Sequence, residues 1–149
     1  MWDYAYSHDA AATPAQLWAY YGNPARWPEF DPGLASVSVD GPFVPGTHGT
    51  FTPRPGDPRG TDPIPFTLTF AETDQGFTAR SALPDTTTFQ FTHMLTALTP
   101  THTRITHGIT LTGPSADTLL PTLRPQLMEL LPTIVIRLAN LASGGGEID

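Results

Sequence analysis

The stretch "FQFTHMLTALTPTHTRITHGITL" (residues 89–111) has the alternating pattern of two β-strands joined by a turn. Every second residue is apolar apart from one histidine in each half: Phe89, Phe91, His93 and Leu95, then Ile105, His107, Ile109 and Leu111. Residues spaced by two share one face of a strand. The stretch therefore predicts an antiparallel hairpin whose apolar face carries two imidazoles. Whether His93 lies directly opposite His107 or one step away on the diagonal, their Cβ atoms are expected within roughly 8 Å.

Similar alternation elsewhere predicts a larger antiparallel sheet. The expected strands are 2–10, 34–40, 47–53, 64–72, 76–83, 87–98 and 103–112. In "IPFTLTF" (64–70), Ile64, Phe66, Leu68 and Phe70 are expected to point inward. The segment "PRPGDPRGTDP" (53–63) is rich in proline and glycine, which predicts a long loop that is a plausible lid.

Helices are expected at three places. Thr13 and Pro14 have the pattern of a helix start, and a second short helix or turn is expected around 25–31. After Ser115, leucines recur at three- and four-residue spacing through a long final helix that includes Leu127 and Leu131. The order predicts an α+β fold in which a curved antiparallel sheet of about seven strands wraps around the C-terminal helix and encloses a cavity. We expect one domain over 1–149, with a frayed tail at 143–149.

Composition excludes several kinds of function. The sequence has 149 residues, 39% of them hydrophobic and only 14% charged, and its net charge is −7. All seven basic residues are scattered arginines, which argues against a nucleic-acid partner. The absence of lysine and cysteine excludes Schiff-base and thiolate chemistry. We expect no cofactor, no metal, no membrane span and a cytoplasmic location.

Four segments resemble a known superfamily. They are "LWAYYGNPARWPEFDPGLASVSVDGPFVPGTHG" (17–49), "FTHMLTAL" (91–98), "TRITHGITLTGP" (103–114) and "LPTIVIRLANLA" (131–142). Together they resemble the START-like, or Bet v 1-like (SRPBCC), superfamily in its polyketide cyclase/dehydrase and lipid-transport branch. The resemblance implies the helix-grip fold, and activities that range from aromatase/cyclases to lipid carriers and self-resistance proteins. For first-ring aromatase/cyclases it also implies a pocket arginine, tyrosine and histidine. His93 or His107 matches the histidine, whereas Arg54 and Arg80 fall on the polar side of the alternation.

His93 and His107 are the first candidates for catalysis. Burial and mutual repulsion should keep both imidazoles neutral, so that one can accept a proton while the other donates a hydrogen bond. The alternative is that they only orient a ligand or satisfy each other. His8 could extend the row on the same face. Three imidazoles would suit zinc, but no ligand-spacing motif supports a metal.

Acidic and aromatic residues supply the remaining candidates. Glu29 near the cavity mouth could act as an acid or base, unless Asp31 only caps a turn and Glu29 is solvated. The residues expected to line a ligand cavity are Trp27, Phe30, Phe51, Phe66, Phe70, Phe89, Phe91, Leu127 and Leu131.

The loop arginines allow two interpretations. Arg54 and Arg59 could meet an anionic group of a ligand, or they could be surface residues paired with Asp57 and Asp62.

Two hypotheses of function follow. The chain is an enzyme of the lyase or isomerase type that cyclises or dehydrates a polyketide-like intermediate by histidine acid/base catalysis without a cofactor. Alternatively, it is a carrier or self-resistance protein that sequesters its ligand. Both hypotheses require a hydrophobic small molecule as the partner.

Overall fold

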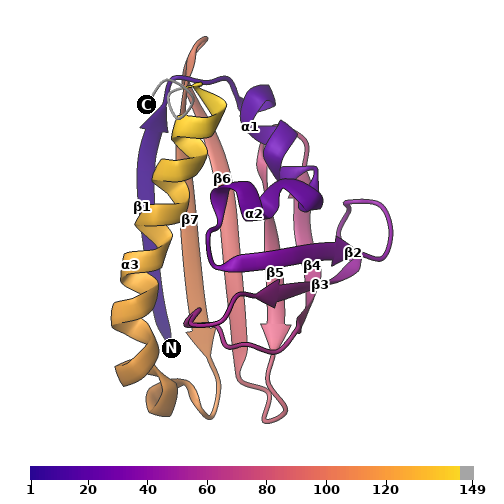
Figure 1. The fold of residues 1–149 in the computed structure, drawn as a ribbon, viewed down its shortest axis with the longest axis vertical. Helices are drawn as coiled ribbons and strands as arrows, with labels where there is room; N and C mark the ends of the chain where they lie inside the picture. The colour runs from indigo at the N-terminus through magenta and orange to yellow at the C-terminus, as the bar shows by residue number, and fades with distance from the viewer. Residues whose placement is uncertain (145–149) are drawn as a thin grey trace.

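A seven-stranded antiparallel sheet and one long helix form the architecture of the computed structural model, which describes residues 1–144 (Figure 1). The elements are β1 (Trp2–Ala10), α1 (Pro14–Tyr21), the 3-10 turn η1 (Pro24–Arg26), α2 (Trp27–Phe30), β2 (Leu34–Val39), β3 (His48–Pro53), β4 (Ile64–Glu72), β5 (Gly76–Ala82), β6 (Thr88–Thr99), β7 (His102–Thr112) and α3 (Ala116–Ala142). The strand order is β1-β7-β6-β5-β4-β3-β2. This is the predicted helix-grip α+β fold.

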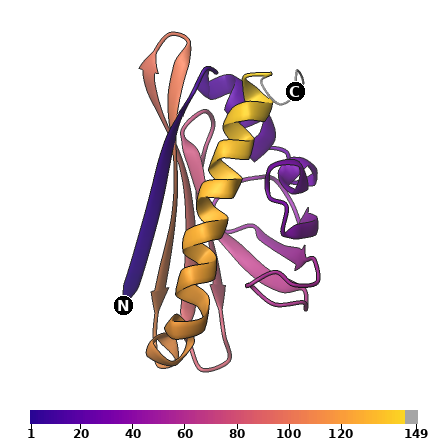
Figure 2. The same cartoon turned by 60° about the vertical axis from the view of Figure 1, so that its left-hand side comes forward.

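The helix α3 lies against one face of the sheet. Figure 2 shows it running beside β1 and β7, with α1 and α2 near its C-terminal half, and it contacts all four of these elements. Its buried side chains recur at three- and four-residue spacing: Leu127, Leu131, Ile134, Val135 and Leu138. This apolar stripe is the reason the helix packs on the sheet, because burial of such a stripe is the main source of helix stability in a protein.

The two predicted helix starts are held in different ways. At α1, the Thr13 hydroxyl accepts from the Gln16 amide at 3.1 Å, and the Gln16 side chain accepts from the Thr13 amide at 2.8 Å. This reciprocal capping box confirms the predicted start. At α3, the Ser115 side chain makes no cap and bonds Asp85, while its amide donates to the Thr87 hydroxyl at 2.8 Å. The start of α3 is therefore tied to the turn between β5 and β6.

The register of β6 against β7 makes the two histidines direct partners. His93 lies opposite His107, which is the first of the two predicted registers. In β4 the alternation is interrupted by a shift between Leu68 and Phe70, and Phe70 then pairs with Thr78 rather than with an inward residue of β5. The expectation that Phe70 points inward is therefore wrong. A β-bulge moves the following residue to the opposite face.

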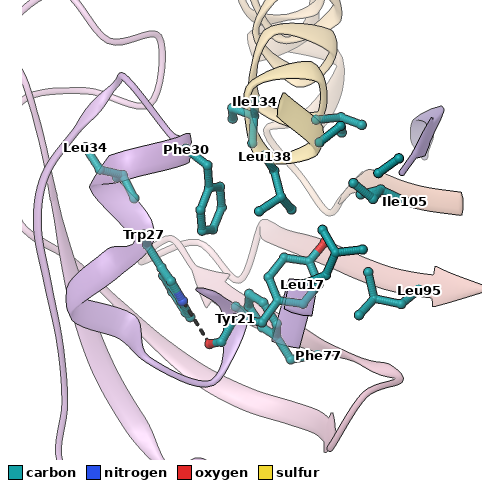
Figure 3. Close-up of a cluster of buried hydrophobic side chains, with 14 of the residues drawn as sticks. Leu17, Tyr21, Trp27, Phe30, Leu34, Phe77, Leu95, Ile105, Ile134 and Leu138 are labelled. Atoms are coloured by element: carbon teal, nitrogen blue, oxygen red, sulfur yellow. Dashed lines mark hydrogen bonds between the residues drawn. The ribbon is translucent and has the colours of Figure 1, made fainter. Parts of the chain in front are cut away.

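The main core lies where α1, α2 and α3 meet the sheet (Figure 3). Trp27 from α2 donates its indole N–H to the Tyr21 carbonyl of α1 at 3.0 Å. The Trp27 ring also stacks on Phe77 of β5, with ring centroids 4.9 Å apart. These contacts fix the short helices over the centre of the sheet.

Two further sequence expectations concern the helices and the tail. Among residues 1–144, no helix combines the length and apolarity that a membrane crossing requires. The frayed tail expected at 143–149 falls mostly on 145–149, which lie outside the described residues.

Gly113 gives a test of how α3 is placed. It joins β7 to α3 with a φ of +118°, and a Cβ added there would lie 2.6 Å from the Thr87 Cα. We predict that Gly113→Ala lowers the free energy of unfolding by at least about 1–2 kcal/mol, because L-residues avoid this backbone region. Urea denaturation followed by circular dichroism measures the change.

Gly41→Ala is the matched control. Gly41 is exposed, and an added Cβ would meet nothing nearer than 4.0 Å. Equal stability of the two variants would show that the turn before α3 tolerates a side chain, contrary to this description.

Candidate functional site: two adjoining cavities under the long helix

Both predicted histidines border a small cavity of about 50 Å³ between the sheet and the helices. Trp27 and Phe30 of α2 and Leu131 of α3 supply apolar walls. The period-two alternation of β6 and β7 turns both imidazoles toward this space, as the sequence predicts. The prediction that they are close neighbours on the concave face is confirmed, because their ring centroids lie 4.6 Å apart, edge to face.

His107 is held by a tyrosine. Its Nε2 lies 2.6 Å from the Tyr21 hydroxyl, and both side chains are buried. Burial raises the pKa of the Tyr21 phenol well above its usual value, so the phenol keeps its proton. Burial lowers the pKa of His107 well below its usual value, and the neighbouring His93 adds to this effect. Within residues 1–144, His107 Nε2 is the one hydrogen-bond partner of the Tyr21 hydroxyl, so the buried phenol proton is satisfied by donation to Nε2, and the single proton of the neutral His107 ring lies on Nδ1.

His93 has the complementary arrangement. Its Nδ1 lies 3.3 Å from the Phe77 carbonyl oxygen, which can only accept, so Nδ1 carries the proton and Nε2 has a free lone pair. The ring stacks on Phe77 with centroids 3.9 Å apart. Burial lowers the pKa of His93 to about 3, the Phe77 carbonyl opposes this shift, and the charge of Arg59 strengthens it.

The two rings therefore present one hydrogen-bond donor and one hydrogen-bond acceptor to the same cavity. His107 has an Nδ1–H donor, and His93 has an Nε2 acceptor. His8 adds nothing to this pair, since it pairs with Ile105 while Tyr6 lies opposite His107. Within residues 1–144, no group of three side chains is placed to hold a metal ion.

A larger cavity of about 370 Å³ adjoins the histidine cavity. The two cavities share Phe51, Arg59 and Phe91 in their linings. The volume is within the range of roughly 300–1,000 Å³ that is typical of small-molecule sites. The larger cavity lies between the first turns of α3, the ends of β5 and β6, and the 53–63 loop.

Most of the predicted lining residues border these cavities. Trp27, Phe30 and Leu131 line the small one, Phe89 and Leu127 line the large one, and Phe51 and Phe91 line both. Phe66 lies in the core, with its ring about 6 Å from those of Trp27 and Phe51, and it borders neither of the two. Phe70 is absent from both linings because the bulge in β4 places it on the other face.

A buried ion-pair cluster ties the 53–63 loop to the end of α2. The Arg59 guanidinium forms two hydrogen bonds with Asp31 and two with Asp57, all between 2.8 and 2.9 Å. Burial lowers the pKa of Arg59, but the two carboxylates more than offset this and raise it overall. The predicted pairing with Asp57 is confirmed, but the surface location expected for Arg59 is wrong. Arg54, the other loop arginine, instead donates to the Leu34 carbonyl at 2.9 Å.

The structure does not bring Glu29 to the histidines. Its carboxylate pairs with Arg26 at 3.1 Å on the surface, and it lines neither cavity. The expected position at a cavity mouth is therefore corrected in favour of the solvated alternative. Asp31 accepts from the Gly33 amide at 3.1 Å, so it caps a turn as the same alternative expected, in addition to binding Arg59.

Two polar residues of the site were not predicted from the sequence. Tyr21 follows Leu17 by one helical turn, so it reads as an apolar position of α1, and its partner His107 lies 86 residues away. Ser81 belongs to the inward set of β5 with Phe77 and Ala79 and lines the large cavity. The sequence did contain a signal for Ser81: it follows the charged Arg80 in β5, so strand alternation places Ser81 on the inward face.

Comparison with known proteins supports the fold. No protein-family profile and no characterised protein matches the sequence. Among solved structures, the Zhui aromatase/cyclase from Streptomyces sp. R1128 is 8% identical with a TM-score of 0.74, over 95% of this chain and 93% of that one. The di-domain aromatase/cyclase StfQ from the steffimycin biosynthetic pathway is 12% identical with a TM-score of 0.76, over 98% of this chain and 52% of that one.

A plant protein has the same architecture. Norcoclaurine synthase from Thalictrum flavum is 14% identical with a TM-score of 0.70, over 94% of this chain and 85% of that one. At such low identities the likeness concerns the fold. This chain has the Bet v 1-like helix-grip fold that the sequence resemblance implies.

Proposed function

We propose that this protein binds a hydrophobic small molecule across the two adjoining cavities and cyclises or dehydrates a polyketide-like intermediate at the paired histidines, without a cofactor. The observation that carries the proposal is the pair of adjacent imidazoles, whose ring centroids lie 4.6 Å apart. His107 offers a donor and His93 an acceptor, at the wall of an apolar cavity. Chemistry at a carbon acid next to a carbonyl requires both functions at once.

The proposed dehydration uses each ring once. The His107 Nδ1–H donates a hydrogen bond to the carbonyl oxygen of a β-hydroxy ketone, which stabilises the developing enolate. His93 Nε2 accepts the proton from the carbon between the two oxygen-bearing carbons. The carbon–oxygen bond to the hydroxyl then breaks, and His93 returns the proton to the leaving oxygen. The products are an enone and water, and both imidazoles end neutral.

Two lines of comparison support this chemistry. Two of the proteins that share the fold are described as aromatase/cyclases. Of the pocket arginine, tyrosine and histidine that the resemblance implies for a first-ring cyclase, Arg59 and both histidines line the small cavity, and Tyr21 lies behind it, bonded to His107. The Arg59 guanidinium is occupied by two carboxylates, so its proposed role is to hold the 53–63 loop in place where the two cavities meet.

A non-catalytic carrier or self-resistance protein is the second candidate function. It is favoured by the pKa of about 3 at His93, because a general base works best when its pKa lies near the working pH. An imidazole of such low basicity still binds a ligand hydroxyl as an acceptor. The two candidates therefore differ in whether His93 moves a proton or only receives a hydrogen bond.

Substitution of the histidines separates the candidates. We predict that His93→Ala or His107→Ala lowers single-turnover conversion of a poly-β-ketone thioester by about 10²–10⁴-fold, since each removes one proton-transfer or donor group. Equilibrium affinity should fall by about tenfold at most, the effect of one lost hydrogen bond. Rapid-quench kinetics at saturating substrate, beside equilibrium dialysis, measures both quantities.

Phe91→Ala is the control for these variants. It removes apolar wall from both cavities and should weaken binding more than it slows the chemical step. Wild-type conversion rates in both histidine variants would eliminate the catalytic proposal. Tight binding with no conversion by the wild type would leave the carrier function.

Acid titration tests whether His93 is neutral in the folded protein. An unfolded histidine has a pKa of about 6.5, whereas that of His93 is lowered to about 3. Between these values only the unfolded chain binds the proton, so His93 makes the protein less stable as the pH falls and has no effect above about 6.5. Acidification from pH 6 to pH 4 should therefore lower the free energy of unfolding of the wild type. We predict that this decrease is smaller in His93→Asn, by about 1.4 kcal/mol per pH unit.

Asparagine retains a donor for the Phe77 carbonyl, so the comparison isolates the titration. Phe91→Leu, in the same strand, should leave the slope as it is in the wild type. Identical slopes for His93→Asn and the wild type would mean that His93 is protonated as easily in the folded protein as in the unfolded chain. Chemical denaturation at each pH provides the free energies.

A further inference from the structure

Ser81 is a buried hydroxyl without a partner. It lies on β5 opposite Phe89 of β6, is 7% exposed, and borders the large cavity. Among the side chains of residues 1–144, its Oγ is the one buried nitrogen or oxygen atom that makes no hydrogen bond. An unsatisfied buried hydroxyl destabilises a folded protein, and alanine at the same place would not. A serine here therefore lowers the stability of the free protein, and a hydrogen bond to a ligand in the cavity would offset that loss.

The other residues that line the large cavity indicate which kind of ligand it can bind. Phe89, Phe91, Leu123 and Leu127 present hydrocarbon surface. Besides Ser81, Arg59 is the polar side chain of this lining, and four of its hydrogen bonds go to carboxylate oxygens.

Charge in the wall also disfavours ionised ligands. Arg59 with Asp31 and Asp57 carries a net charge of −1, so the cluster has no spare positive charge for an anion. Neither carboxylate lines the large cavity, so a ligand cation would contact no counter-charge there. Burying an unpaired charge in such a site is costly.

We infer that Ser81 is the polar anchor of the large cavity: its side chain, which has no partner within residues 1–144 to give up, turns toward the cavity and hydrogen-bonds one hydroxyl or carbonyl oxygen of a neutral, largely apolar ligand. This inference rests on the proposed binding function and names its ligand class. The anchor lies in the large cavity, whereas the histidines face the small one. A ligand held at Ser81 is thereby oriented, with its other end toward Phe51, Arg59 and Phe91, where the two cavities meet.

Matched aromatic probes test the anchor. Equilibrium dialysis of the full chain against 2-naphthol, naphthalene and 2-naphthoate compares a neutral oxygen, no oxygen and an anion on one ring system. We expect the wild type to bind 2-naphthol about three- to tenfold more tightly than naphthalene, the effect of one hydrogen bond. Ser81→Ala should remove that preference and leave naphthalene affinity unchanged. The anion should bind more weakly than the alcohol.

A second readout separates an anchor from a structural serine. Thermal unfolding of Ser81→Ala without ligand should occur at the wild-type temperature or above it, because the variant removes an unpaired buried hydroxyl. Ser36→Ala, an exposed serine of β2, should alter neither affinity nor stability. A lower unfolding temperature for Ser81→Ala together with an unchanged 2-naphthol preference would overturn the anchor and leave the proposed function standing. Tighter binding of 2-naphthoate would overturn the neutral-ligand class, and failure of all three probes to bind would overturn the proposed function itself.

Discussion

The hydrogen bond between Tyr21 and His107 is the interaction on which the site depends. It joins the end of α1 to the middle of β7, in the buried interior, across 86 residues of sequence. The backbone carbonyl of Tyr21 also accepts from the Trp27 indole and so holds α2, and the Tyr21 ring contacts those of Phe77 and His93. One residue thus places both short helices over the sheet and determines which nitrogen of His107 carries the proton.

Burial keeps both histidines neutral, and it also makes them weak bases. A desolvated imidazole stays neutral, and two neutral rings with opposite polarity at the cavity can hold a carbonyl and a hydroxyl together. The same desolvation leaves His93 a weak base, with a pKa of about 3. Catalysis at this site would therefore rely on orientation and on stabilisation of the enolate by His107 more than on the strength of the base.

Alternation in the sequence was sufficient to predict the sheet, the hairpin and the inward position of both histidines, because a buried face imposes a period of two. It was insufficient at Phe70, because a β-bulge moves the following residue to the opposite face of the strand, and the residue types give no clear sign of the bulge. Glu29 was misplaced because the sequence does not show which side of the one-turn helix α2 faces the cavity; the structure leaves Glu29 exposed, beside Arg26. The partnership of Tyr21 and the isolation of the Ser81 hydroxyl depend on residues far apart in the chain, so no local pattern shows them.

The proposed site requires that His93 and His107 are neutral rings with their protons on Nδ1, so that His93 presents a free Nε2 and His107 a free Nδ1–H to the cavity. Nitrogen-15 NMR of the imidazoles across pH 4–8 tests it most directly, because ring nitrogen shifts distinguish both tautomers from the charged form. We predict that both rings keep the Nδ1–H tautomer throughout this range, and that Tyr21→Phe releases His107 alone from it. Titration of either ring near pH 6.5, or an Nε2–H tautomer at His107 in the wild type, would contradict it.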